Sequence, residues 1–134
     1  MSQNLEADVL IVEDEKKLRF FASEVFRLEN ISSAAVADGC QAMQFFEEAL
    51  TQAGRVPRVV LLDLTMPCLS GYEVYKQIAA ASWCGQVTVI ITSAAGDKFD
   101  TLPGPAKTLQ LTKPYEVQSL IDMLHKVAPD LFAA

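Results

Sequence analysis

The sequence contains short apolar stretches rich in branched residues, separated by longer segments in which apolar residues recur at helical spacing. The apolar stretches cover residues 8–12, 32–37, 59–64, 87–92 and 108–112. Several of them are apolar almost throughout, which is typical of β-strands that are covered on both faces. Helical spacing of apolar residues is found within residues 18–28, 42–50, 74–78 and 117–127.

This alternation predicts an α/β fold with an open, doubly wound parallel sheet of five strands and helices on both faces. One helix start is marked by Ser70, which precedes Glu73 by the spacing of a capping box. The alternation of strands and helices is interrupted at residues 96–105, which contain two prolines and two glycines. Because proline interrupts a helix, we predict a shortened or irregular fourth helix there. We expect residues 128–134 to form a frayed end.

The composition is that of one compact domain, with 134 residues of which 51% are hydrophobic and 21% are charged. We therefore expect a single domain over residues 1–134, with its core at about residues 7–128. Seventeen acidic and eleven basic residues give a formal net charge of −6. A negative net charge repels the phosphate backbone of nucleic acids, so direct binding of nucleic acid is not expected.

The longest apolar runs, such as residues 59–62 and 87–91, are far shorter than the ~20 residues that cross a bilayer. Residues 1–4 form no basic and apolar leader. We expect neither membrane insertion nor secretion, and therefore a cytoplasmic location.

The three cysteines are widely spaced, and none belongs to a C-x-x-C motif: Cys40, Cys68 and Cys84. Cysteine is among the residue types that are most often buried. We therefore predict reduced thiols with a structural role.

Polar residues gather where the predicted strands end, which is where ligands bind in a doubly wound sheet. The first strand is followed by Glu13 and Asp14, and the third ends near Asp63. If the first and third strands are neighbours, Glu13 or Asp14 approaches Asp63. Two carboxylates ~4 Å apart repel by about 4 kcal/mol at an effective dielectric of 20, unless a proton or a metal ion offsets the charge. Mg²⁺ suits such a site, since it accepts one or two carboxylates and leaves positions for phosphate oxygens. Alternatively, Glu13 or Asp14 could simply cap the helix that begins near Lys16.

The fourth and fifth predicted strands bring further polar groups to the same edge of the sheet. Lys113 ends the fifth strand, and its ammonium group suits a phosphate or an aspartyl phosphate. Pro114 follows and permits a cis peptide bond. Ser93 offers a hydroxyl for a phosphoryl oxygen, but Thr92 is a rival because strand pleating sends the two side chains to opposite faces. Taken alone, the lysine could be a surface residue and the serine a turn residue.

Taken together, these residues resemble the receiver domains of bacterial two-component response regulators. The matching segments occur in the order of that family: VLIVEDE at 9–15, ADG at 37–39, LLDLTMPCLSG at 61–71, VIITSA at 89–94 and LTKPY at 111–115. They span nearly the whole chain, and the specificity comes from their combination.

The resemblance implies a flavodoxin-like sheet with strand order 2-1-3-4-5, and it implies a role for each site residue. Asp63 would accept a phosphoryl group. Asp14 would bind Mg²⁺ directly, Glu13 mainly through water, and Thr65 through its backbone carbonyl. Two further residues would contact the phosphoryl group: Ser93 and Lys113. The chain would be a signalling module that catalyses only its own phosphorylation and dephosphorylation.

The implied partners are a sensor histidine kinase or a histidine phosphotransfer protein, together with an output partner or a missing effector domain. The sequence departs from the family at Gln110, where an aromatic residue is common, and in its proline-broken fourth helix. A small Mg²⁺-dependent phosphatase with Asp63 as nucleophile is the alternative function. It is disfavoured by Thr65, since dehalogenase-like phosphatases usually carry a second Asp at that position. Pseudo-receivers lose the acidic residues, which are present here, and flavodoxin-like binding modules need a phosphate-binding loop, which is absent.

Overall fold

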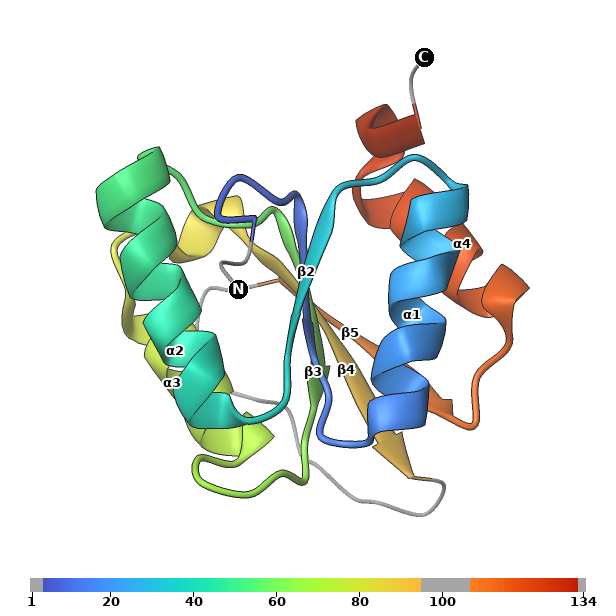
Figure 1. The fold of residues 1–134 in the computed structure, drawn as a ribbon, viewed down its shortest axis with the longest axis horizontal. Helices are drawn as coiled ribbons and strands as arrows, with labels where there is room; N and C mark the ends of the chain where they lie inside the picture. Colours follow the sequence, from blue (N-terminus) through green and yellow to red (C-terminus); the bar gives the residue numbers. More distant parts are fainter. Residues whose placement is uncertain (1–3, 95–106, 133–134) are drawn as a thin grey trace.

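The computed structural model describes residues 4–94 and 107–132. Five parallel strands form one sheet in the order β2-β1-β3-β4-β5 (Figure 1). Their bounds are Val9–Val12 for β1, Ser33–Val36 for β2, Val59–Asp63 for β3, Thr88–Ala94 for β4 and Lys107–Lys113 for β5. The predicted α/β fold and strand order are therefore confirmed.

The predicted helices are present, and each connects consecutive strands or follows the last one. Their bounds are Lys16–Leu28 for α1, Gly39–Glu48 for α2, Gly71–Ala80 for α3 and Val117–Val127 for α4. One π-helical turn, Ala49–Ala53, extends α2, and a 3₁₀ turn, Cys84–Gln86, precedes β4. Ser70 is the N-cap of α3, because its hydroxyl accepts a hydrogen bond from the amide of Glu73 at 3.3 Å. Within the described residues, no helix is both long enough and apolar enough to cross a membrane.

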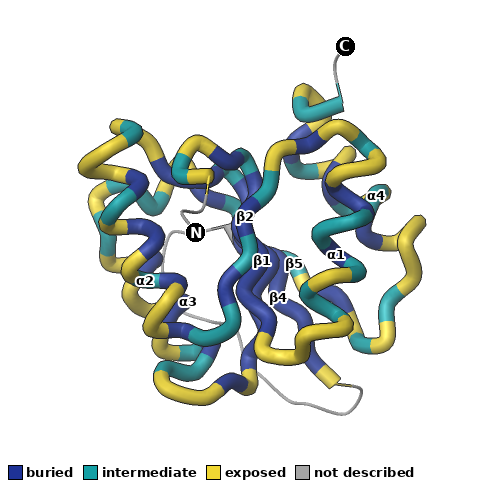
Figure 2. The backbone as a smooth tube through the Cα atoms, viewed as in Figure 1, coloured by how far each residue is buried: buried dark blue, intermediate teal, exposed yellow. Residues whose placement is uncertain are grey.

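Two apolar cores lie on the two faces of the sheet. Helices α2 and α3 cover one face, where Phe46, Tyr75 and Ile78 pack against Leu10 and Leu62. Helices α1 and α4 cover the other face (Figure 1). Figure 2 shows that the strands at the centre of the molecule are buried, whereas the outer faces of the helices are exposed. The three central strands, β1, β3 and β4, are apolar along most of their length because both of their faces are covered.

Two of the expectations from the sequence concern the later part of the chain. The predicted irregular segment at residues 96–105 lies outside the described residues. The expectation of a frayed end was wrong for residues 129–132, which form a 3₁₀ turn. Leu131 and Phe132 pack against the α1/α4 core, and Arg58 binds the carboxylate of Asp130 with 2.7 Å between Nη2 and Oδ1. These contacts hold the end of the chain against the start of β3.

Candidate functional site

The register of the sheet places the charged residues at one edge. Val12 pairs with Leu62, so Glu13 follows β1 at the level where Asp63 ends β3. Lys113 pairs with Ala94 and is the last residue of β5. Since parallel strands end at the same edge, three side chains that are distant in sequence become neighbours.

Lys113 contacts both buried carboxylates. Its Nζ lies 2.8 Å from Oε1 of Glu13 and 3.3 Å from Oδ2 of Asp63. Glu13 and Asp63 are 4% and 6% exposed, a degree of burial that charged carboxylates tolerate only when they are paired. The peptide bond between Lys113 and Pro114 is cis, as the sequence permits.

The carboxylates of Glu13, Asp14 and Asp63 form a cluster that suits a divalent ion. One carboxylate oxygen from each residue lies within 4.8 Å of the others. Glu13 and Asp63 are buried, whereas Asp14 is exposed. The backbone amide of Thr65 donates to Oδ1 of Asp63 at 3.2 Å, which places the Thr65 peptide beside the cluster. An all-oxygen donor set with an exposed side fits Mg²⁺, which retains water ligands.

Burial and the neighbouring charges shift the pKa values of these groups in opposite directions. Burial raises the pKa of Asp63 above its ordinary value, although the nearby ammonium group of Lys113 counteracts it. Burial raises the pKa of Glu13 in the same way, against its hydrogen bond with Lys113. Burial alone would lower the pKa of Lys113, but its bonds with Glu13 and Asp63 outweigh this effect and leave that pKa raised. The site therefore favours a protonated lysine next to carboxylates that need a cation.

Backbone contacts hold the turn that carries the first two acids. Arg19 donates from Nη1 to the carbonyl oxygens of Glu13 at 2.8 Å and Asp14 at 3.3 Å. Oε2 of Glu13 accepts from the amide of Glu15 at 3.1 Å, immediately before α1. The N-cap of α1 is Glu15, which makes no side-chain cap bond. Glu13 thus supports this turn as well as contacting Lys113, and no sequence signal had pointed to Arg19.

Both candidate hydroxyl groups are buried on β4. Thr92 pairs in register with Asp63, while Ser93 is the next residue and points to the opposite face of the sheet. The two residues are each 2% exposed. Gln110 donates from Nε2 to the hydroxyl of Ser93 at 3.1 Å. This exposed amide therefore holds the hydroxyl from β5, at the position where the family commonly has an aromatic residue.

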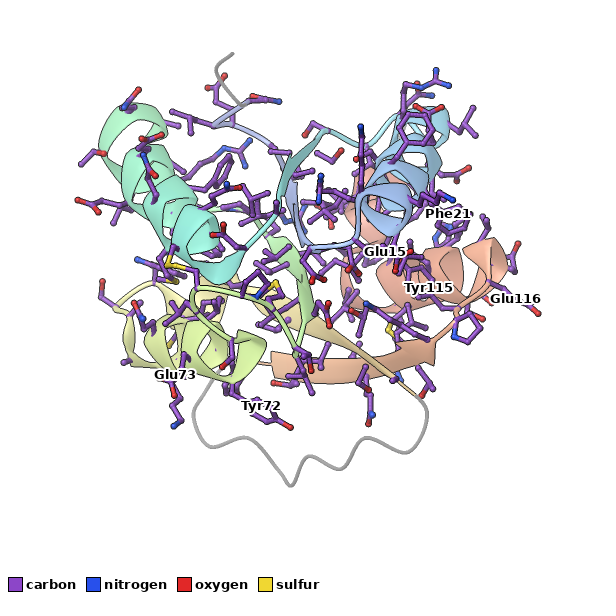
Figure 3. The ribbon with its side chains drawn as sticks, turned by 60° about the horizontal axis from the view of Figure 1, so that its bottom comes forward. Glu15, Phe21, Tyr72, Glu73, Tyr115 and Glu116 are labelled. Atoms are coloured by element: carbon purple, nitrogen blue, oxygen red, sulfur yellow. A yellow bond between two sulfur atoms is a disulfide. The ribbon has the colours of Figure 1, made fainter. Side chains whose placement is uncertain are left out.

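Aromatic and acidic side chains border the site edge on the α1/α4 side. In Figure 3, Glu15 lies at the start of α1, Tyr115 lies just before α4, and Tyr72 and Glu73 lie at the start of α3. The rings of Phe21 and Tyr115 are 6.1 Å apart, and Tyr115 packs against the α1/α4 core. Burial raises the pKa of Tyr115 to about 12, with a further contribution from the charge of Glu13.

The connection between β3 and α3, residues 64–70, packs tightly against its surroundings. A Cβ atom at Gly71 would lie 2.1 Å from the carbonyl oxygen of Asp63. A Cβ atom at Gly39 would lie 2.0 Å from the carbonyl oxygen of Leu69. Neither distance is possible for a real side chain, so both glycines allow close backbone approach. The connection therefore lies in close contact with the end of β3 and with the start of α2.

The expectation of three reduced cysteines was wrong for two of them. Cys40 and Cys68 form a disulfide, with 6.0 Å between their Cα atoms, whereas Cys84 is a free thiol. The partners are 28 residues apart, and only the packing of α2 against residues 64–70 makes them neighbours. No spacing motif in the sequence could have revealed this pairing.

Comparison with known proteins agrees with the fold. The family model of the response regulator receiver domain matches residues 9–125. Sensory transduction protein RegX3 of Mycobacterium tuberculosis is 35% identical over 121 residues, which cover 89% of this chain and 49% of that protein. Sporulation initiation phosphotransferase F of Bacillus subtilis is 28% identical over 124 residues, covering 90% of this chain and 93% of that protein. The chain thus spans about half the length of RegX3 and nearly all of the second relative.

Solved structures show the same architecture. The receiver domain of a sensor histidine kinase from Pseudomonas aeruginosa, with a magnesium ion coordinated in its active-site cleft, is 25% identical with a TM-score of 0.76, covering 90% of this chain and 96% of that one. A response regulator receiver domain protein from Methanospirillum hungatei is 20% identical with a TM-score of 0.75, covering 92% and 95% of the two chains. The second similarity concerns the fold alone.

Proposed function

Because the chain belongs to the receiver domain family of two-component response regulators, we propose that Asp63 accepts a phosphoryl group from a phosphohistidine. The donor would be a sensor histidine kinase or a histidine phosphotransfer protein. The observation that carries this proposal is the position of Lys113, whose ammonium group contacts both Glu13 and Asp63. A buried carboxylate beside a lysine at a strand end is suited to become an aspartyl phosphate.

In the proposed reaction, a carboxylate oxygen of Asp63 forms a bond to phosphorus while the bond from phosphorus to the histidine nitrogen breaks. The imidazole leaves with the electron pair of that bond and takes up a proton. Lys113 balances the negative charge on the phosphoryl oxygens, and a buried hydroxyl of β4 donates a hydrogen bond to one of them. We assign this role to Ser93, and Thr92, which pairs in register with Asp63, is its rival. Phosphoryl transfer depends mostly on such positioning and charge compensation.

The carboxylates of Glu13, Asp14 and Asp63, together with the carbonyl of Thr65, would hold Mg²⁺. The fit rests on the oxygen cluster within 4.8 Å and on the exposure of Asp14. When bound, Mg²⁺ would neutralise charge on the transferred phosphoryl group. The magnesium ion in the similar receiver domain from Pseudomonas aeruginosa supports this assignment.

The aspartyl phosphate would act as the signal, so catalysis would be limited to phosphorylation and dephosphorylation of the chain itself. Phosphorylation would change the binding of a partner protein or of an output domain. We propose that residues 1–134 form one receiver domain with its core at about residues 7–128, and that it works in the cytoplasm.

Mass spectrometry of the intact protein after treatment with acetyl phosphate tests the proposal. We expect one phosphoryl group to be added when Mg²⁺ is present and far less when EDTA replaces it. Asp63→Asn should abolish the addition, because the amide is a poor nucleophile. Asp122→Asn, which alters an exposed carboxylate on α4, should leave it unchanged. Equal labelling of the Asp63→Asn variant would refute the assignment of Asp63.

A further inference from the structure

The disulfide between Cys40 and Cys68 connects two elements that border the candidate site. Cys40 is the second residue of α2, and Cys68 lies within the connection 64–70 between β3 and α3. Both residues are exposed. The bond is therefore accessible to small thiols and disulfides, unlike a bond buried in the core.

The connection held by this disulfide is the one that leaves the proposed phosphoacceptor. It begins directly after Asp63, and the amide of Thr65 within it donates to Oδ1 of Asp63. Cys68 itself has a φ of 68°, in the left-handed region that L residues other than glycine seldom adopt. A covalent bond to α2 restricts how far this connection can move away from Asp63.

We propose that Cys40 and Cys68 form a reversible redox modification site, whose disulfide state tightens the binding of Mg²⁺ beside Asp63. This inference rests on the proposed function, because it concerns regulation of the same site. In a reducing compartment, disulfides in proteins are mostly transient or redox-sensing. In the cytoplasm, where we propose that the protein works, an exposed pair such as Cys40 and Cys68 would belong to that class.

Oxidation would proceed by thiol–disulfide exchange with a low-molecular-weight disulfide such as oxidised glutathione. The thiolate of one cysteine attacks a sulfur of this disulfide, which forms a mixed disulfide and releases one glutathione thiolate. The second cysteine thiolate then attacks the protein sulfur of the mixed disulfide and releases the second glutathione thiolate. The two protons of the cysteines end on the released thiols, and two electrons pass from the cysteines to glutathione. Reduction is the reverse sequence.

The effect on Mg²⁺ follows from the position of Thr65. With the disulfide closed, the connection already presents the Thr65 peptide to the acidic cluster. With the disulfide open, the connection samples more conformations, and Mg²⁺ binding must order it again. A preorganised site binds more tightly because less conformational entropy is lost. We expect the oxidised form to bind Mg²⁺ at least about threefold more tightly than the reduced form.

Counting thiols tests the redox site without reference to phosphorylation. The protein is equilibrated with mixtures of reduced and oxidised glutathione, denatured in the presence of N-ethylmaleimide, and weighed by mass spectrometry. We expect three adducts at the reducing end and one at the oxidising end, since Cys84 is the cysteine that lies outside the disulfide. A Cys84→Ser variant should lose one adduct at both ends. Three adducts at every glutathione ratio, or stable glutathione adducts in place of the intramolecular bond, would overturn the site.

Isothermal titration calorimetry of Mg²⁺ binding to the oxidised and to the reduced protein tests the coupling between the disulfide and the metal site. The double variant Cys40→Ser, Cys68→Ser should bind Mg²⁺ like the reduced wild type, whatever the redox buffer. Because the wild type is measured in both states, the test does not depend on how well the variant folds. Equal affinities within about twofold would overturn the coupling. If neither form bound Mg²⁺, the coupling and the proposed metal site would both fail, while the thiol count would still decide the redox site.

Discussion

Lys113 forms an ion pair with Glu13 in which Nζ and Oε1 are 2.8 Å apart, at the edge where β5 ends. The same ammonium group lies 3.3 Å from Oδ2 of Asp63. The lysine is thus shared between a proposed metal ligand and the proposed phosphoacceptor. A phosphoryl group on Asp63 would compete with Glu13 for this positive charge.

Replacing Lys113 by glutamine should therefore slow phosphorylation. The variant leaves Glu13 and Asp63 as neighbouring buried carboxylates without their cation, so the pKa of each should rise further above its ordinary value. It also removes charge compensation from the transferred phosphoryl group. We expect the initial rate of labelling by acetyl phosphate to fall about 100-fold, which is typical for the loss of one such donor.

The matched control for Lys113 is Lys76→Gln, which removes an exposed lysine that pairs with Glu73 on α3. Its labelling rate should equal that of the wild type. If the Lys113→Gln rate stayed within about threefold of the wild type, the shared lysine would have no role in the transfer.

The two hydroxyl residues of β4 can be separated by substitution. We expect Ser93→Ala to lower the labelling rate about tenfold, because the proposed hydrogen bond to the phosphoryl group is lost. Thr92→Val removes the other hydroxyl but keeps the branched shape of the side chain, and it should change the rate by less than about threefold. The rate at which acetyl phosphate labels each variant, followed by intact mass spectrometry, tests this assignment. A larger loss of rate in Thr92→Val than in Ser93→Ala would assign the role to Thr92.

The positions of the charged residues were predictable because they follow from two simple rules. Apolar runs covered on both faces mark parallel strands, and parallel strands present their carboxyl ends at one edge. Asp63 and Lys113 each end such a strand, and Glu13 follows one, so their shared edge could be inferred without coordinates. Their proximity within that edge also required the strand order, which came from the resemblance to receiver domains.

Other contacts of the site depend on details that the sequence does not display. The bond from Gln110 to Ser93 requires the register of β5 on β4, in which Ile91 pairs with Gln110. The Cys40–Cys68 disulfide requires the close approach of α2 to residues 64–70, which is permitted by Gly39. Such contacts come from tertiary packing, for which local periodicity carries no signal.

Gly71 should be intolerant of even the smallest side chain. A Cβ atom there would meet the carbonyl oxygen of Asp63 and, at 2.6 Å, Cα of Leu64, both of which are backbone atoms that cannot rotate away. We expect Gly71→Ala to lower the free energy of unfolding by about 3 kcal/mol in urea denaturation. The variant should also lower the labelling rate, because the displaced backbone is that of Asp63.

Gly85→Ala is the matched control, since a Cβ atom at Gly85 would have nothing within 4 Å and the φ of this residue is not in the left-handed region. We expect its free energy of unfolding to be unchanged or raised by about 0.5 kcal/mol. Equal stability of the two variants would contradict the tight approach between β3 and the start of α3.

The raised pKa of Tyr115 gives the protein a specific weakness in alkaline solution. Burial favours the neutral phenol, so the pKa is about 12 in the folded chain against an ordinary value of 10.0. A group whose folded pKa is raised stabilises the fold fully below its unfolded pKa, and this contribution disappears as the pH rises through the folded value. The free energy of unfolding should therefore fall between pH 10 and 12 in the wild type and less steeply in Tyr115→Phe. Absorbance of tyrosinate should show one titration step near pH 12 that the variant lacks. An unchanged titration curve in Tyr115→Phe would contradict the burial of this phenol against α1.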